Sequence, residues 1–192
     1  MVADSPRDRR RLFFSLWPSD DCRAQLESAT SAIAHASGGR IIPPRNFHVT
    51  LLFLGEVQAS RIDAVQQLAG AITGVPRFDL RFDRVEAWPG SNVLCLCTSE
   101  MPSAVIELAD QLRYCLRGEQ FRSGEQEFRP HVTLVRDLPR LRATQSIEPL
   151  CWKVNEFVLV ESRPGDGSRY CVIGRWPLPP RNSGSGILPR PS

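Results

Sequence analysis

The sequence predicts an α+β fold in a single domain, and three observations support this prediction. The chain has 192 residues, a length that suits one domain or two small lobes with a shared core. Its hydrophobic fraction of 42% and charged fraction of 23% are ordinary for a globular protein. Strand-like and helix-like segments follow one another irregularly, as strand, helix, strand, helix, two strands, helix, strand and two strands. Because helices and hairpins are mixed, the pattern favours α+β over a regular parallel winding.

The first half of the chain contains two strand–helix units. Pro18-Ser19-Asp20-Asp21 provides a turn, a capping side chain and early acidic residues, which together predict a helix start. Gly38-Gly39 ends that helix, and Gly55 closes the following strand. The predicted elements are a strand from Arg11 to Trp17, a helix from about Asp20 to Ala36, a strand over 47–54 and a helix over 59–72.

The second half combines hairpins with one helix. Alternation of apolar residues predicts a strand from Phe78 to Trp88, and the turn Pro89-Gly90-Ser91-Asn92 leads into its partner, Val93 to Thr98. Residues 137–149 look irregular because they contain Pro139 and Pro149. The other predicted elements are a helix from Pro102 to about Arg117, a buried strand in the stretch 128–136, a strand from Val154 to Val160, a turn at 164–167 and a strand from Arg169 to Trp176.

The ends of the chain have a different composition from its centre. We therefore expect one domain over residues 11–177, a loose arm over 1–10 and a disordered tail over 178–192, which is rich in Pro, Gly and Ser. The apolar runs are too short to span a bilayer, and the N-terminus lacks an apolar signal core. We expect a monomeric protein in the cytoplasm with no membrane partner.

Cysteine and arginine usage constrain the function only weakly. The six cysteines mostly lie in apolar patterns, so we interpret them as small buried hydrophobic residues rather than disulfides. Lys153 is the sole lysine, and arginine suits phosphate recognition because of its planar, forked guanidinium group. A GC-rich genome would produce the same arginine content, and the formal net charge is only +3. Charge alone therefore does not indicate a nucleic-acid partner.

The most informative feature is the tetrapeptide His-Val-Thr-Leu, which occurs at 48–51 and again at 131–134. Side chains alternate across a strand, so His48 and Thr50 should project to one face. His131 and Thr133 should do the same in the second copy. The third histidine, His35, is expected to face solvent or cap a helix. Two related lobes would bring both His–Thr pairs to one cleft.

Two imidazoles and two hydroxyls form a set of groups that suits a phosphate. One neutral histidine can take a proton from water, and the other, protonated, can give one to a departing oxygen. The threonine hydroxyls can bind the non-bridging oxygens. The pattern therefore predicts chemistry on a strained or cyclic phosphodiester, with no metal and no cofactor.

Two alternatives to this interpretation remain open. A single His-x-Thr in a strand is commonly a satisfied polar pair, although its exact repetition puts function slightly ahead of chance. A zinc site would usually need three protein ligands, and no third ligand stands at a recognisable spacing.

Around these residues the sequence resembles the two-histidine (2H) phosphoesterase superfamily. The similarity is greater to its LigT/ThpR branch of RNA 2′,3′-cyclic phosphodiesterases. The doubled His-Val-Thr-Leu carries the resemblance, together with Phe53-Leu54-Gly55 after the first copy and Pro130 before the second. Weaker support comes from Arg11-Leu12-Phe13-Phe14, Arg169-Tyr170 and Arg175-Trp176. The resemblance covers about residues 11–177.

The resemblance implies a bilobal LigT-like fold, with two antiparallel sheets related by a pseudo-two-fold and helices on the outside. It implies hydrolysis of an RNA 2′,3′-cyclic phosphate end to a 2′-phosphate, with reversible 2′-5′ joining of RNA ends at the same site. The partner would be RNA with such a terminus, tRNA fragments among the candidates. His48 would be the acid and His131 the base, an assignment that the symmetry of the two motifs allows to be reversed. Thr50 and Thr133 would hold the phosphate.

Two further residues are candidates through the same resemblance. Arg136 matches a family arginine near the site, but by parity it points away from His131 unless the strand ends or bulges there. Phe14 could stack on the terminal base, or it could be a core phenylalanine. The stretch 163–167 departs from the branch, so the cleft rim there is not predicted.

Two other functions are compatible with these motifs. One is a 2H enzyme acting on another cyclic or 2′,5′-linked nucleotide. The other is an RNA-end binding protein without turnover, against which the presence of two complete motifs argues.

Overall fold

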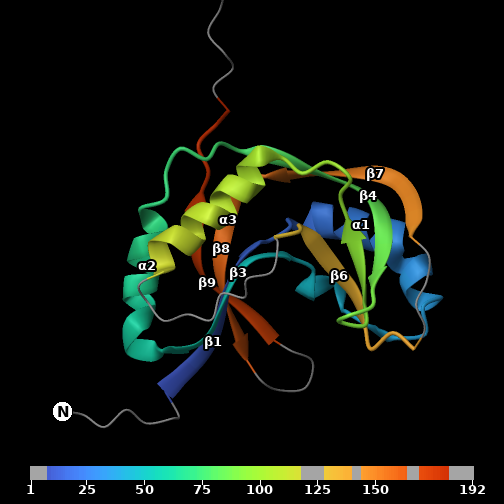
Figure 1. The fold of residues 1–192 in the computed structure, drawn as a ribbon, viewed down its shortest axis with the longest axis horizontal. Coiled ribbons are helices and arrows are strands. Elements are labelled where there is room, and N and C mark those ends of the chain that lie inside the picture. Colours follow the sequence, from blue (N-terminus) through green and yellow to red (C-terminus); the bar gives the residue numbers. More distant parts are fainter. Residues whose placement is uncertain (1–7, 118–127, 140–143, 164–168, 182–192) are drawn as a thin grey trace, which may run out of the picture.

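The structure is a computed structural model that describes residues 8–117, 128–139, 144–163 and 169–181 (Figure 1). Three α-helices lie in this described part: α1 (Asp20–His35), α2 (Ile62–Gly70) and α3 (Ser103–Leu116). The described strands are β1 (Arg9–Leu16), β2 (Arg40–Ile41), β3 (Val49–Gln58), β4 (Phe78–Trp88), β5 (Val93–Cys97), β6 (His131–Arg136), β7 (Gln145–Val154), β8 (Glu156–Arg163) and β9 (Arg169–Pro177). Short 3₁₀ turns cover Pro44–Asn46 and Ala59–Arg61.

The strands form one antiparallel sheet in the order β7-β4-β5-β6-β3-β1-β8-β9, with the short β2 added beside β6. Its two halves, β7-β4-β5-β6 and β3-β1-β8-β9, meet at β3 and β6, where the register contains a single pair, Val49 with Val132. The chain runs β1-α1-β3 in one half and β5-α3-β6 in the other, and each time it returns to the neighbouring strand. The topology therefore repeats about a pseudo-two-fold between the motif strands. The two predicted sheets are halves of one sheet.

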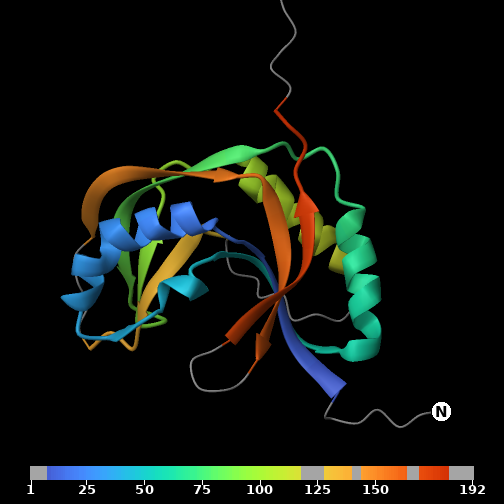
Figure 2. The ribbon, with the colours of Figure 1, turned by 180° about the vertical axis from the view of Figure 1, so that it is seen from behind.

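The helices cover both halves from the outside. Helix α1 contacts β6 and β7, whereas α3 contacts β3 and α2 contacts α3 and β9. Figures 1 and 2 show α2 and α3 at one end of the molecule and α1 at the other. The main core lies between helices and sheet, and its largest fully buried side chains include Phe14, Phe82 and Phe157. This arrangement leaves the opposite face of the sheet free to carry polar side chains.

Most sequence-predicted elements are present, and their local causes are visible. Ser19 caps α1 as predicted, since its Oγ accepts a hydrogen bond from the Cys22 N–H, with Asp20 and Asp21 in the first turn. Gly55 has a φ of 73°, a left-handed conformation that suits glycine. It lies where β1 and β3 shift register between Leu12 and Phe13. The glycine therefore permits a bulge in the motif strand.

The predicted irregular stretch 137–149 is wrong from Gln145 onward, where β7 begins. Strand β7 pairs only with β4, so it is an edge strand with largely exposed side chains. An edge strand tolerates proline, and the β4–β7 register shift between Phe82 and Arg84 accommodates Pro149. The sequence of β7 contains proline and few alternating apolar residues, so it did not show the pattern that predicts a strand.

The described structure extends beyond residues 11–177 at both ends. Strand β1 begins at Arg9, and Leu178 is buried, with its N–H donating to the Asn155 carbonyl. The remaining parts of the predicted arm and tail, 1–7 and 182–192, and the predicted turn at 164–167 lie outside the described residues.

The six cysteines are all free. The prediction that they are mostly buried holds for Cys95 and Cys97 only, because Cys22, Cys115 and Cys171 are half-buried and Cys151 is exposed. Within the described ranges, no helix is long and apolar enough to cross a membrane.

Candidate active site

The two copies of the repeated motif lie side by side. Strands β3 and β6 are antiparallel, and Val49 pairs with Val132. This register places His48 across from Thr133 and Thr50 across from His131. Both valines are fully buried, while the histidines and threonines are partly exposed on the other face. The predicted alternation of the motif is therefore confirmed, and both His–Thr pairs share one face.

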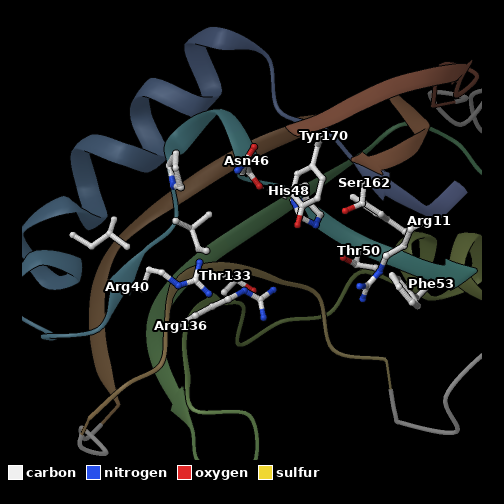
Figure 3. Close-up of a pocket in the computed structure, with 14 residues that line it drawn as sticks. Arg11, Arg40, Asn46, His48, Thr50, Phe53, Thr133, Arg136, Ser162 and Tyr170 are labelled. Atoms are coloured by element: carbon white, nitrogen blue, oxygen red, sulfur yellow. Dashed lines mark hydrogen bonds between the residues drawn. The ribbon is translucent and has the colours of Figure 1, made fainter. Parts of the chain in front are cut away.

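A cavity of about 740 Å³ opens on this face (Figure 3). Its lining includes four of the predicted residues, His48, Thr50, Thr133 and Arg136. His131 is not part of the lining. It stands two residues before Thr133 on β6. The cavity is thus lined by the histidine and threonine of the first motif copy and by the threonine of the second.

Backbone carbonyls fix the tautomer of both histidines. Nδ1 of His48 lies 2.7 Å from the Asn46 carbonyl oxygen, and Nδ1 of His131 lies 2.7 Å from that of Arg129. A carbonyl oxygen only accepts, so each Nδ1 carries a proton and donates it. Each carbonyl lies two residues before its histidine. Nε2 is consequently the nitrogen that can exchange protons with a ligand.

Matching bulges follow both threonines. The β1–β3 register passes from Ser15–Thr50 to Phe14–Leu52 and skips Leu51. The β5–β6 register likewise skips Leu134 between Thr133 and Val135. An extra residue reverses the alternation beyond it, so the third residue after each threonine returns to the cavity face.

These third residues are Phe53 and Arg136, and both line the cavity. Strand alternation alone would have pointed Arg136 away from His131. The bulge reverses the alternation, so Arg136 faces the cavity.

The predicted base-stacking role of Phe14 is wrong. Phe14 is fully buried, with its ring 6.2 Å from Phe157 and 5.7 Å from Trp176. Its neighbour Phe13 points to the opposite face, lines the cavity and lies 5.0 Å from the His48 ring. Strand alternation assigns the two phenylalanines to opposite faces, but the sequence did not indicate which face was the core.

Aromatic side chains surround His48. Besides Phe13, the Trp17 ring is stacked at 5.8 Å with an interplanar angle of 17°, and the Tyr170 ring is edge-on at 5.2 Å. Burial lowers the pKa of His48 to about 4, and the positive charges of His131 and Arg136 act in the same direction. His48 is therefore neutral at pH 7. Trp17 and Tyr170 contact His48 but stand in no repeated motif, so the sequence did not indicate them as site residues.

His131 has a different environment. The Trp88 ring lies 4.4 Å from its ring, and the Arg129 guanidinium lies 4.9 Å above that tryptophan. Burial lowers the pKa of His131, and the cationic Arg129 and Arg136 lower it further. Both Nε2 atoms thus present lone pairs.

Guanidinium groups give the cavity a positive potential. Arg11, Arg40 and Arg136 all line it (Figure 3). Arg40 forms an ion pair with Asp137 at 3.0 Å, and Arg11 lies 4.9 Å above the Phe53 ring. Among the described residues, neither Arg11 nor Arg136 forms an ion pair with a carboxylate. Their charges are available to an anionic ligand.

The described part of the chain contains no group of three or more His, Cys, Asp or Glu placed to hold a metal ion.

Comparison with known proteins decides the family. A family model for the 2′-5′ RNA ligase superfamily matches residues 18–166. The chain belongs to this superfamily. The resemblance to 2H phosphoesterases inferred from the doubled His-Val-Thr-Leu is confirmed.

Relatives of this chain match most of its length. The RNA 2′,3′-cyclic phosphodiesterase of Escherichia coli K12 is 34% identical over 175 residues, which cover 88% of this chain and 97% of that protein. The protein of the same name from Archaeoglobus fulgidus is 28% identical over 163 residues, covering 79% and 90%.

The fold agrees as well. The crystal structure of E. coli LigT complexed with 3′-AMP matches with a TM-score of 0.82 at 32% identity, covering 88% of this chain and 98% of that one. The predicted LigT-like fold is confirmed.

Proposed function

We propose that this protein is an RNA 2′,3′-cyclic phosphodiesterase that opens the cyclic phosphate at an RNA end to a 2′-phosphate. The observation that carries the proposal is the antiparallel apposition of the two His-Val-Thr copies about Val49 and Val132. It brings two imidazoles, each with Nδ1 anchored to a carbonyl, to one face beside two hydroxyls and a guanidinium. Relatives named RNA 2′,3′-cyclic phosphodiesterase support the substrate class.

In the proposed reaction, Nε2 of His131 takes a proton from water while the water oxygen bonds to phosphorus. The bond from phosphorus to the 3′ oxygen breaks, and Nε2 of protonated His48 gives its proton to that oxygen. The products are a 2′-phosphate and a free 3′-hydroxyl. His48 ends neutral and His131 protonated, and proton exchange with solvent restores the starting forms.

The environments of the two histidines support this division of roles. His48 is neutral mainly because the surrounding side chains desolvate it, and a bound phosphodiester anion would strongly favour its protonated form in such a low-dielectric place. Arg136 lowers the pKa of both histidines, whereas the cationic Arg129 acts on His131 and keeps favouring its neutral form. The substrate itself therefore supplies the charge that makes His48 an acid.

Thr50, Thr133 and Arg136 would hold the non-bridging oxygens. All three side chains line the same cavity (Figure 3). Their hydroxyl and guanidinium hydrogens can donate to oxygens whose negative charge grows in the transition state. A 5′-hydroxyl in place of water would give a 2′,5′ linkage by the same proton transfers, so reversible joining of RNA ends belongs to the proposal.

The substrate is RNA with a cyclic phosphate terminus, tRNA fragments among the candidates. We further propose that the protein acts in the cytoplasm. We also propose that it acts as a monomer, because one chain supplies all of the site residues.

The proposal is tested with the wild-type protein and an RNA oligonucleotide ending in a 2′,3′-cyclic phosphate, in EDTA. We expect turnover to the 2′-phosphate, measured by ³¹P NMR. A 3′-phosphate product would reverse the leaving oxygen. Faster turnover of a mononucleotide cyclic phosphate or a 2′,5′-linked oligoadenylate would favour a 2H enzyme for other nucleotides. Tight binding of the RNA end without turnover would favour a binding protein.

A further inference from the structure

Glu86 of β4 carries a carboxylate that the proposed proton transfers do not use. Its side chain is only 15% exposed. One of its oxygens, Oε2, accepts from Nη2 of Arg129 at 2.9 Å and from the indole Nε1 of Trp88 at 3.2 Å. Arg129 lies 43 positions away in the sequence. A largely buried carboxylate that joins Trp88, two residues along its own strand, to the distant Arg129 constrains both side chains.

Both partners of Glu86 contact His131. The Trp88 ring packs 4.4 Å from the imidazole, and the Arg129 carbonyl accepts from Nδ1 of His131 at 2.7 Å. The Arg129 guanidinium also lies 4.9 Å above the Trp88 ring. The four residues therefore form a closed ring of contacts, in which Arg129 contacts His131 through its backbone carbonyl and Glu86 through its guanidinium.

We infer that Glu86 is a positioning residue for His131: it acts through Arg129 and Trp88 to hold the imidazole in the orientation that the reaction needs. The inference rests on the proposed function. His48 is held differently, by the Asn46 carbonyl and aromatic rings.

The surrounding charges show why a carboxylate is needed there. Glu86 is also 3.4 Å from Arg84, whose Nε is buried without a hydrogen-bond partner. Without Glu86, the positive charges of Arg84 and Arg129 would lose the carboxylate that lies between them on the face that carries His131. Their repulsion would displace Arg129 and with it the contacts to the imidazole. The charged or titratable groups that surround His131 are Arg84 and Glu86 on β4, Cys95 and Cys97 on β5, Arg129 before β6, Arg136 on β6 and His48 beside β3.

The test compares Glu86→Gln with Asp83→Asn. The amide at 86 keeps an acceptor for Trp88 but removes the charge that pairs with Arg129. Asp83 is a matched control, because it lies on the same strand near Arg84, at 3.6 Å, but accepts hydrogen bonds from Ser99. The readouts are kcat and KM on the cyclic-phosphate RNA and the NMR titrations of both histidines.

For Glu86→Gln we expect kcat to fall about tenfold with KM within about twofold, since a modest misplacement of a catalytic group costs rate rather than affinity. The His131 titration should move to lower pH, because Arg129 loses its counter-charge, and the His48 titration should stay in place. Glu86→Asp, which keeps the charge, should recover part of both effects. Asp83→Asn should resemble wild type.

Equal kcat values and equal His131 titrations in Glu86→Gln and Asp83→Asn would overturn the inference. A wild-type protein without turnover would count against the proposed function instead. The NMR comparison would then still decide whether Glu86 controls His131.

Discussion

Val49 lies directly opposite Val132, and this pair joins the two halves of the sheet. Because the pairing is antiparallel, it places each motif histidine across from the threonine of the other copy. A slip of one residue in either strand would turn that strand's histidine to the opposite face and separate the two His–Thr pairs. Both valines are fully buried, so the core that stabilises the sheet also fixes the register of the site.

Burial of His48 makes stability depend on pH. The folded protein holds the pKa of His48 at about 4, below the ordinary value of 6.5. The unfolded chain therefore binds more protons between these values, and the free energy of unfolding should decrease as pH falls from about 6.5 to 4, by up to about 3 kcal/mol. Urea unfolding across this range checks the prediction. His48→Gln should lose this part of the decrease, and His35→Gln, a substitution on the surface, should keep it.

A bound anion should raise the pKa of His48. Titration of both histidines by NMR, with and without a 2′-nucleotide, measures the change. We expect the larger upward movement for His48, because His48 lines the cavity that would hold the anion, whereas the cationic Arg129 beside His131 continues to lower the pKa of that histidine. A larger rise in the pKa of His131 would indicate that His131 is the acid and His48 the base.

Arg136→Ala should lower kcat/KM on the cyclic-phosphate RNA by about 10- to 100-fold, as expected for the loss of a charged hydrogen bond to phosphate. Steady-state kinetics at several salt concentrations measure this. Arg45→Ala is the control, because Arg45 is exposed and does not line the cavity. Similar kinetics for the two variants would show that Arg136 does not contact the substrate.

Gly39→Ala should disturb the support of Arg136. A Cβ at this position would lie 2.6 Å from the Arg136 carbonyl oxygen and 2.6 Å from Cγ1 of Val135, so β2 could not approach β6. We expect a loss of about 1–3 kcal/mol in the free energy of unfolding and a lower kcat/KM. Gly90→Ala, whose Cβ would meet no atom within 4 Å, should leave activity and thermal unfolding nearly unchanged. Normal activity in Gly39→Ala would contradict this account.

Local sequence patterns predicted much of the fold. The capping residue Ser19 and the alternation of Phe78 to Trp88 specified elements that the structure contains. The repeated motif identified the two strands at the sheet centre, because its polar and apolar residues alternate and it occurs twice.

Features that depend on contacts between distant segments could not be predicted. The bulges at Leu51 and Leu134 bring Phe53 and Arg136 to the cavity, and a bulge is a property of strand pairing. Nothing near Phe14 in the sequence distinguishes it from Phe13, since only the packing of helices on one face makes that face the core. The contact between Glu86 and Arg129 likewise arises from folding alone.

The most direct test of the central claim compares wild type with His48→Ala, His131→Ala and the double variant on an RNA ending in a 2′,3′-cyclic phosphate, in EDTA. If the apposed histidines act as one acid–base pair, each single change should lower kcat by about 1,000-fold or more, and the double change should cost little beyond either single one. Folding of each variant is checked by circular dichroism. Substantial turnover after loss of either histidine, or losses that multiply in the double variant, would contradict the account.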